Sequence, residues 1–178
     1  MYEGLVFAGF GGQGVILSGK LLCIAAMNEG KHVSHIPSYG AEMRGGTANC
    51  SVIVSDEEIG APLVPNPTVA VVLNNPSLLK FEPRLKPGGL LIYNTSLIDL
   101  EPQRDDIDIV GINANDLAQE EGSTRAANMI ALGVLAKKKE ELCDLESLIK
   151  ALDYAVSARN KELNVINTAC LKKGYEIG

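Results

Sequence analysis

The sequence has no tryptophan, only three phenylalanines and only two histidines among its 178 residues. Its apolar runs are no longer than a strand, and its N-terminal segment has no basic start. We therefore expect neither a secretory signal nor a membrane span, and we expect the protein in the cytoplasm. Positive charge is also scarce, with 16 Lys and Arg against 22 Asp and Glu. Nucleic-acid binding depends on clustered cations, so this acidic chain is a poor candidate for it.

Paired cysteines are missing as well. The four cysteines, Cys23, Cys50, Cys143 and Cys170, lie far apart in the sequence and form no C-x-x-C pair. Zinc and iron–sulfur sites usually take at least two ligands from one short loop, so we expect no metal site in this chain. Cys23 and Cys50 have apolar neighbours, which is typical of small core residues in a reducing compartment.

The residues that are present predict one α/β domain. With 46% apolar residues, the chain is long enough for one domain with a core and short for two. It opens with an apolar strand at 4–9, a glycine loop, and a helix at 15–28 that Gly30 ends. Strand, glycine loop and helix in this order begin a doubly wound domain. We predict a single Rossmann-like, three-layer domain over residues 1–178 with a mostly parallel sheet.

Apolar periodicity predicts the remaining elements and a helical C-terminal third. Further strands are expected at 31–36 (ending at Pro37), 47–55, 69–73, 90–94 and 108–112. Helices are expected at 77–81, 115–120, 126–136, 145–156 and 161–172. The helix at 126–136 is apolar nearly all round, which leaves two interpretations open. It packs inside this domain's own core, or another subunit covers its outer face.

The glycine loop matches the pattern G-x-G-x-x-G at Gly9, Gly11 and Gly14, with Gly12 and Gln13 between them. Between a strand and a helix, such glycines permit a tight turn and let backbone amides approach a phosphate. A dinucleotide site also needs an acidic residue at the end of the second strand, and the predicted strand has none there. This absence weakens an NAD site. Glycines that serve only tight strand–helix packing explain the pattern at least as well.

A second loop, at 38–46, combines hydroxyl, acidic and basic side chains with glycines. Its candidate contact residues are Ser38, Tyr39, Glu42, Arg44, Gly45 and Gly46. The Arg44 guanidinium can grip a carboxylate or a phosphate, and the glycines let a cofactor or a partner approach closely. A surface ion pair between Arg44 and Glu42 is the alternative, and it would stabilise little. Because the loop leaves the carboxyl end of a strand beside the glycine loop, we expect it to contact a ligand or a partner.

Several segments together form a specific pattern. The first two are Gly-Phe-Gly-Gly-Gln-Gly at 9–14 and Pro-Ser-Tyr-Gly-Ala-Glu-Met-Arg-Gly-Gly-Thr-Ala-Asn-Cys-Ser at 37–51. Asn-Pro-Ser at 75–77, Pro-Gly-Gly at 87–89 and Asn-Met-Ile-Ala-Leu-Gly at 128–133 extend the pattern over almost the whole chain. The chain thereby resembles the gamma subunit of the 2-oxoacid:ferredoxin oxidoreductases. The sequence of the second loop resembles the 2-oxoglutarate branch most and the branched-chain 2-oxoacid enzymes next. It lacks the motif that is typical of the pyruvate enzymes.

The resemblance implies one subunit of an enzyme that converts a 2-oxoacid to an acyl-CoA and carbon dioxide and passes electrons to ferredoxin. It implies alpha and beta subunits, and a delta subunit, as partners. No cofactor is expected on this chain alone. Thiamine diphosphate, Mg²⁺, 4Fe-4S clusters and coenzyme A are expected in the holoenzyme. Tyr39, Glu42 and Arg44 are expected to face the alpha subunit or the mouth of the active site.

An independent catalytic role has little support in the sequence. No Ser/His/Asp order, metal cluster or pair of facing carboxylates is evident, and Glu42 and Arg44 are only weak catalytic candidates. We therefore expect no activity from the chain alone. The alternative is a free-standing nucleotide-binding module with a regulatory or scaffolding role. That hypothesis predicts adenine-nucleotide binding at the glycine loop, abolished by Gly11→Ala or Gly14→Val.

Overall fold

The computed structural model describes residues 1–39, 47–157 and 160–178. The strands are β1 (Tyr2–Phe10), β2 (His32–Tyr39), β3 (Thr47–Ser55), β4 (Val69–Val72), β5 (Leu90–Asn94) and β6 (Asp108–Ile112). The helices are α1 (Val15–Asn28), α2 (Asn75–Phe81), α3 (Ala114–Glu120), α4 (Ala127–Lys138), α5 (Leu145–Ala155) and α6 (Leu163–Ile177). Short 3-10 turns, η1 (Glu82–Arg84) and η2 (Thr124–Ala126), follow α2 and precede α4.

The strands form one mixed sheet in the order β2-β3-β1-β4-β5-β6. β1, β4, β5 and β6 run parallel, whereas β3 pairs antiparallel with both β1 and β2. The predicted α/β fold with a mostly parallel sheet is confirmed. The sequence did not predict that β2 and β3 form an antiparallel hairpin, which extends the sheet beyond β1.

The second strand is longer than its sequence predicts. The prediction ended it at Pro37, but β2 continues through Pro37 to Tyr39. Pro37 lacks an N–H, yet β2 is an edge strand, so its free side needs no ladder hydrogen bond. Ser38 and Tyr39, predicted to lie in the second loop, are therefore the last residues of a strand.

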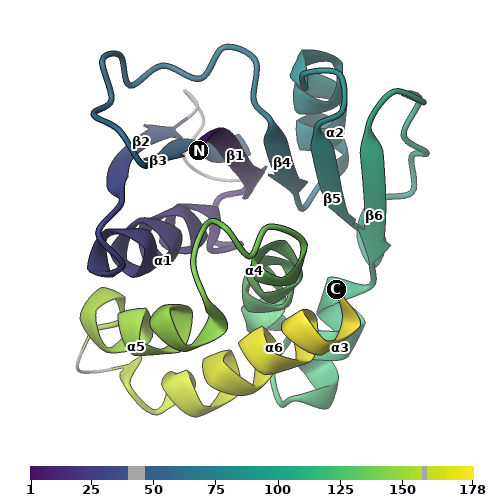
Figure 1. Ribbon diagram of the computed structural model, residues 1–178. Coiled ribbons are helices and arrows are strands. Elements are labelled where there is room, and N and C mark those ends of the chain that lie inside the picture. Colours follow the sequence, from purple (N-terminus) through teal and green to yellow (C-terminus); the bar gives the residue numbers. More distant parts are fainter. Residues whose placement is uncertain (40–46, 158–159) are drawn as a thin grey trace.

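The central strands place alternate side chains in two cores. Leu5 and Phe7 of β1 share a core with α1 and α4, whereas Val6 and Ala8 share a smaller core with α2. Burial on both faces explains why β4 is apolar throughout. Figure 1 shows α2 on one side of the sheet, α1 and α4 on the other, and α5 and α6 farther out.

Helix α4 is apolar all round because this chain covers it. Residues 127–136 are all buried, and α4 packs against both the sheet and α6. At its crossing with α6, a Cβ added to Gly133 or to Gly174 would overlap the backbone of the other helix. This supports the interpretation that α4 belongs to the domain's own core. The close contact also explains why α6 runs through Gly174 to Ile177, beyond its predicted end at 172. Within the described ranges, no helix is both long and apolar enough to cross a membrane.

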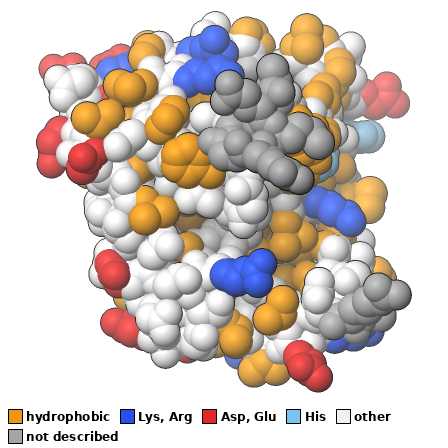
Figure 2. All heavy atoms as spheres, turned by 180° about the vertical axis from the view of Figure 1, so that it is seen from behind, with side chains coloured by type: hydrophobic (Ala, Val, Ile, Leu, Met, Phe, Trp, Pro, Cys, Tyr) orange, Lys and Arg blue, Asp and Glu red, His pale blue; other side chains and the backbone are white. Residues whose placement is uncertain are grey.

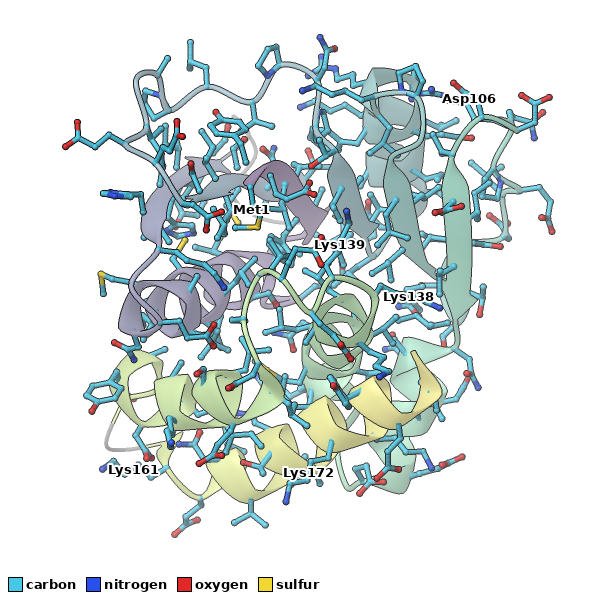
Figure 3. All side chains as sticks on the ribbon, viewed as in Figure 1. Met1, Asp106, Lys138, Lys139, Lys161 and Lys172 are labelled. Carbon is cyan, nitrogen blue, oxygen red and sulfur yellow. The ribbon has the colours of Figure 1, made fainter. Side chains whose placement is uncertain are left out.

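A lysine joins the end of α4 to the start of β1. Lys139 Nζ lies 3.0 Å from Glu3 Oε1 and 3.5 Å from Glu141 Oε1. Figure 3 shows Lys139 near the sheet, whereas Lys161 and Lys172 lie at the outer side of the helical layer. The ion pair thus links the segment after α4 to the first strand of the sheet.

Candidate functional site

The glycine loop between β1 and α1 is closed by one of its own side chains. Gln13 Oε1 accepts a hydrogen bond from the Phe10 N–H at 2.6 Å, and Gln13 Nε2 donates to the Leu73 carbonyl at 3.4 Å. Gly12 and Gly14 have φ angles of 92° and 74°. Glycine adopts this left-handed region without steric strain. Internal hydrogen bonds and backbone preference therefore fix the shape of the loop.

Asn128 of α4 holds the other end of the loop. Its side chain is 4% exposed, and its Nδ2 donates to the Gly14 carbonyl at 3.1 Å and to a serine hydroxyl of α1 at 3.2 Å. A Cβ on Gly14 would overlap Asn128, and one on Gly9 would crowd the loop's own glutamine. Gly11 and Gly12 are exposed, and a Cβ on Gly12 would meet nothing within 4 Å. Close packing therefore explains why positions 9 and 14 are glycine, whereas the space beside Gly12 is empty.

Amide side chains occupy the carboxyl ends of the next two parallel strands. Asn74, after β4, accepts a hydrogen bond from the Ser77 N–H at 2.9 Å. Asn94, at the end of β5, accepts from the Ala114 N–H at 3.1 Å and donates to Asn115 Oδ1 at 2.7 Å. A carboxamide does not exchange a proton near neutral pH. These residues organise the backbone at the edge of the sheet and supply no general acid or base.

Two cavities open beside the glycine loop, and both include Gly12 and Arg125 in their walls. The larger has a volume of about 520 Å³ and lies among the loop, the start of α4, and the segments where α5 ends and α6 begins. Its wall includes apolar side chains such as Leu17, Met129 and Ile166. The smaller, of about 190 Å³, reaches the ends of β4 and β5. An apolar wall with a few polar groups is typical of a ligand site.

The electrostatic character of the cavities is positive. Arg125 lines both, and no Asp or Glu among the described residues lines either, although the chain has 22 of them. The start of α1 adds partial positive charge, because Gly14 caps this helix without a side-chain hydrogen bond. In the view of Figure 2, the acidic side chains lie toward the margins of the molecule. The arrangement can bind an anion.

The start of the second loop lies at the same edge of the sheet as the glycine loop. Tyr39 pairs with Ala48, which in turn pairs with Gly9. Ser38 is exposed, and Tyr39 has 64% of its surface exposed. The remaining predicted contact residues, Glu42, Arg44, Gly45 and Gly46, lie outside the described residues. Their contacts remain a prediction.

The thiols of this chain do not fit an iron–sulfur cluster. All four cysteines are free and buried, as predicted for Cys23 and Cys50. Burial raises the pKa of Cys23, Cys50 and Cys143 to about 12 and that of Cys170 to about 11. Cluster ligands are thiolates, which these surroundings disfavour. In the part of the chain that the structure describes, no three His, Cys, Asp or Glu side chains form a group that could hold a metal ion.

Two residues of the site were not predicted from sequence. Asn128 had a signal, because it is a polar residue at the start of an otherwise apolar helix. Arg125 had none. It lies in η2, where the Ser123 hydroxyl accepts a hydrogen bond from the Arg125 N–H at 3.3 Å. Its cavities are formed by segments that are distant in the sequence, so only the fold reveals its role.

The family model for pyruvate ferredoxin/flavodoxin oxidoreductases matches residues 4–177. The chain belongs to this family. The resemblance read from the loop motifs is therefore confirmed, and the match extends over nearly all of the described fold.

Relatives within the family differ in length. The chain is 40% identical over 169 residues to the ketoisovalerate oxidoreductase subunit VorA of Methanothermobacter marburgensis, covering 95% of this chain and 35% of VorA. It is 32% identical over 180 residues to the 2-oxoglutarate synthase subunit KorC of Methanocaldococcus jannaschii, covering 99% of this chain and 94% of KorC. The chain thus spans about a third of VorA and almost all of KorC.

Solved structures show the same contrast. The gamma subunit of a keto/oxoacid ferredoxin oxidoreductase from Geobacter sulfurreducens has a TM-score of 0.83 at 27% identity, covering 98% of this chain and 96% of that chain. The 2-oxoglutarate:ferredoxin oxidoreductase of Magnetococcus marinus, solved with 2-oxoglutarate, coenzyme A and succinyl-CoA, has a TM-score of 0.85 at 25% identity. There the match covers 99% of this chain and 31% of the longer one.

Proposed function

We propose that this chain is the gamma subunit of a multi-subunit 2-oxoacid:ferredoxin oxidoreductase that acts on 2-oxoglutarate. The holoenzyme would convert the 2-oxoacid to an acyl-CoA and carbon dioxide and pass the electrons to ferredoxin. The observation that carries the proposal is the end-to-end match with KorC, a 2-oxoglutarate synthase subunit of nearly the same length. The amino-acid sequence of the second loop also favours the 2-oxoglutarate branch.

In this proposal the cofactors are bound by other chains. Among the described residues, the carboxyl edge of the sheet holds carboxamides and the guanidinium of Arg125, and the thiols are buried. These groups suit positioning and binding rather than thiamine, Mg²⁺ or 4Fe-4S ligation. Alpha, beta and delta chains would supply those groups. The free buried thiols also agree with our placement of the complex in the cytoplasm.

We assign residues 1–178 to one gamma-type domain whose two loops face a ligand or a partner chain. The site would comprise Gly9, Gly11, Gly12, Gln13, Gly14, Ser38, Tyr39, Glu42, Arg44, Gly45 and Gly46. Gly12 contributes an open backbone, and Tyr39 contributes an exposed ring at the same edge. Arg125 joins this set, since it lines both cavities beside the glycine loop.

A second candidate substrate is 2-ketoisovalerate. The identity with VorA, at 40%, exceeds the 32% identity with KorC. The sequence of the second loop, which resembles the 2-oxoglutarate branch first and the branched-chain 2-oxoacid enzymes next, is what favours the 2-oxoglutarate proposal.

The test is to purify the tagged chain from its native host and assay coenzyme A-dependent reduction of a viologen dye. We expect larger chains to co-purify and 2-oxoglutarate to give the highest kcat/KM. A higher kcat/KM with 2-ketoisovalerate would replace the substrate and leave the subunit role intact. Decarboxylation by the isolated chain would contradict the subunit role. If the chain is purified alone and is thermally stabilised by an adenine nucleotide, the nucleotide-binding module becomes the better hypothesis.

A further inference from the structure

We propose that Asn128 is a positioning residue of the oxidoreductase, which acts through the glycine loop and does not itself touch the reacting atoms. From inside the core it fixes the peptide unit between Gly14 and Val15, and it ties the loop to the segment that carries Arg125. This inference rests on the proposed function, because the loop and Arg125 belong to the site assigned there. It goes beyond that function by giving a buried residue of α4 a part in activity.

The carbonyl group of Gly14 accepts three hydrogen bonds. The Ser18 N–H donates at 2.9 Å, as in any α-helix, and the Ser18 hydroxyl donates at 3.2 Å. Asn128 Nδ2 adds the third hydrogen bond at 3.1 Å. A carbonyl oxygen has only two lone pairs, so this one is fully engaged. The core side therefore determines the orientation of the peptide unit between Gly14 and Val15.

The N–H of the same peptide unit belongs to Val15, the first residue of α1. N–H groups in the first turn of a helix have no acceptor within the helix, and no side chain caps α1. Hydrogen bonds to a carbonyl polarise its peptide unit and strengthen the N–H as a donor. Asn128 therefore affects the direction and the donor strength of an amide at the base of the glycine loop.

The carboxamide of Asn128 serves the loop and not its own helix. Residues 127–136 are all buried, and Asn128 is the one polar side chain among them. Burying a carboxamide costs free energy unless new hydrogen bonds replace those to water. The Asn128 amino group makes them to Gly14 and Ser18, which both lie outside α4. An apolar residue would pack at this position without that cost, so the contact with the loop is what the carboxamide contributes.

Asn128 also joins two walls of the cavities beside the glycine loop. Gly12 and Arg125 line both cavities, and Asn128 lines the larger one. Arg125 lies three residues before Asn128, because η2 leads directly into α4. The hydrogen bond to Gly14 therefore links the wall that carries Arg125 to the wall that carries Gly12. The segments 9–14 and 128–133 of the family pattern meet at this contact, although Gly14 and Asn128 are 114 positions apart.

A group that binds across these walls requires them at a fixed separation. Misplacement by about 1 Å can lower a reaction rate about 100-fold, even when it arises far from the chemistry. A positioning role therefore predicts that loss of Asn128 weakens activity in protein that is fully folded. A purely structural role predicts that activity follows only the fraction of folded protein.

The experiment uses the complex purified from the native host, in which this chain carries Asn128→Ala, Ser18→Ala or the control Val134→Ala. Val134 lies on the same helix, is fully buried and makes none of the hydrogen bonds at the loop. Its replacement removes two methyl groups from the core and leaves the loop contacts in place. Coenzyme A-dependent reduction of a viologen dye, with the 2-oxoacid that the wild-type complex prefers, gives kcat and KM for both substrates. The assay runs well below the Tm of every variant.

We expect kcat/KM to fall about tenfold for Asn128→Ala, mainly through KM, and about threefold for Ser18→Ala, which keeps the Asn128 hydrogen bond to Gly14. The control should stay within about twofold of wild type. Hydrogen–deuterium exchange of peptides that cover residues 10–18 should be faster in Asn128→Ala than in Val134→Ala. This readout reports the loop directly.

A fall in kcat/KM that is confined to the two loop variants, together with faster exchange of the loop, supports the positioning role. Wild-type kcat/KM in Asn128→Ala overturns it at any Tm, because the contact then serves the fold alone. An equal fall in Val134→Ala, or unchanged exchange of the loop, also overturns it. If Asn128→Ala does not fold, Ser18→Ala decides by the same criteria. If the wild-type complex oxidises no 2-oxoacid, the proposed function fails, and this inference fails with it.

Discussion

Where α4 crosses α6, Gly133 and Gly174 lie in the core, and each lets the other helix approach until the backbones touch. In the glycine loop, Gly12 lies at the surface with a positive φ and empty space where a side chain would project. Gly14 combines both conditions, since its φ is positive and Asn128 fills the space beside it. A glycine in the sequence therefore indicates a close approach or a sharp bend, and only the surroundings distinguish packing from an open binding surface.

The largest effect is expected from Gly133→Ala at the helix crossing. The added Cβ would lie 2.8 Å from Tyr175 N and would also overlap the Leu171 carbonyl. Inserting an extra methyl group into a well-packed core costs about 1–3 kcal/mol, and we expect about 3 kcal/mol because both obstacles are backbone atoms. Chemical denaturation measures the free energy of unfolding. If the free energy of unfolding falls by less than about 1 kcal/mol, the two helices can move apart at little cost. The glycines of the crossing would then not differ from those of the glycine loop.

Gly14→Ala is expected to have the next largest effect. The left-handed backbone strains an alanine by about 1–2 kcal/mol, and the new Cβ displaces Asn128 from its hydrogen bonds. We expect a total destabilisation of about 2 kcal/mol, measured in the same way. Unchanged stability would mean that the loop adopts another conformation at no cost. In that case, the packing explanation of Gly14 would be wrong.

The variant Asn128→Ala separates the two causes of the Gly14→Ala effect, which are backbone strain and overlap with the Asn128 side chain. Alone, it removes hydrogen bonds to Gly14 and Ser18, and we expect a loss of about 1–2 kcal/mol. Combined with Gly14→Ala, it also removes the overlap, so the double variant should lose less than the sum of the single variants. Strict additivity in this double-mutant cycle would contradict direct contact between the two residues.

Gly12→Ala is expected to have the smallest effect on stability. Only the positive φ opposes it, at about 1 kcal/mol, because the space around the residue is open. If this loop contacts a ligand or a partner, the variant should lose activity in the complex by more than its small change in Tm explains. Full activity of the complex with Gly12→Ala would instead leave the loop with a structural role only.

The parts of the fold that depend on short-range sequence preferences could be predicted from the sequence. The strand, glycine loop and helix at the start of the chain follow from backbone preferences that act within about fifteen residues, and the structure has them as expected. The full length of β2 could not be predicted, because a proline such as Pro37 usually ends a strand. Pro37 is tolerated here because β2 lies at the edge of the sheet, and the sequence does not reveal that position. Tertiary context here overrides local preference.

The candidate site shows the same division. Gly12 and Gln13, which line the smaller cavity, lie in a short glycine motif that the sequence makes visible, whereas the role of Tyr39 stays a prediction. Arg125 could not be identified in this way, because its larger cavity also takes residues from the glycine loop, α1, α5 and α6, which are brought together only by folding. Likewise, no local pattern pairs Gly133 with Gly174, which are remote in the sequence.

The central position of β1 also affects how the chain can fold during synthesis. β1 is made first, yet Leu5 needs Val52 on one side and Val69 on the other, and both are translated much later. Until β3 has been made, β1 has two unpaired edges, and until β4 has been made it has one, while the hairpin β2–β3 can close through local contacts. Such delayed pairing slows folding and exposes nascent chains to aggregation. The ribosome-bound chain is therefore most vulnerable before residue 69 has emerged.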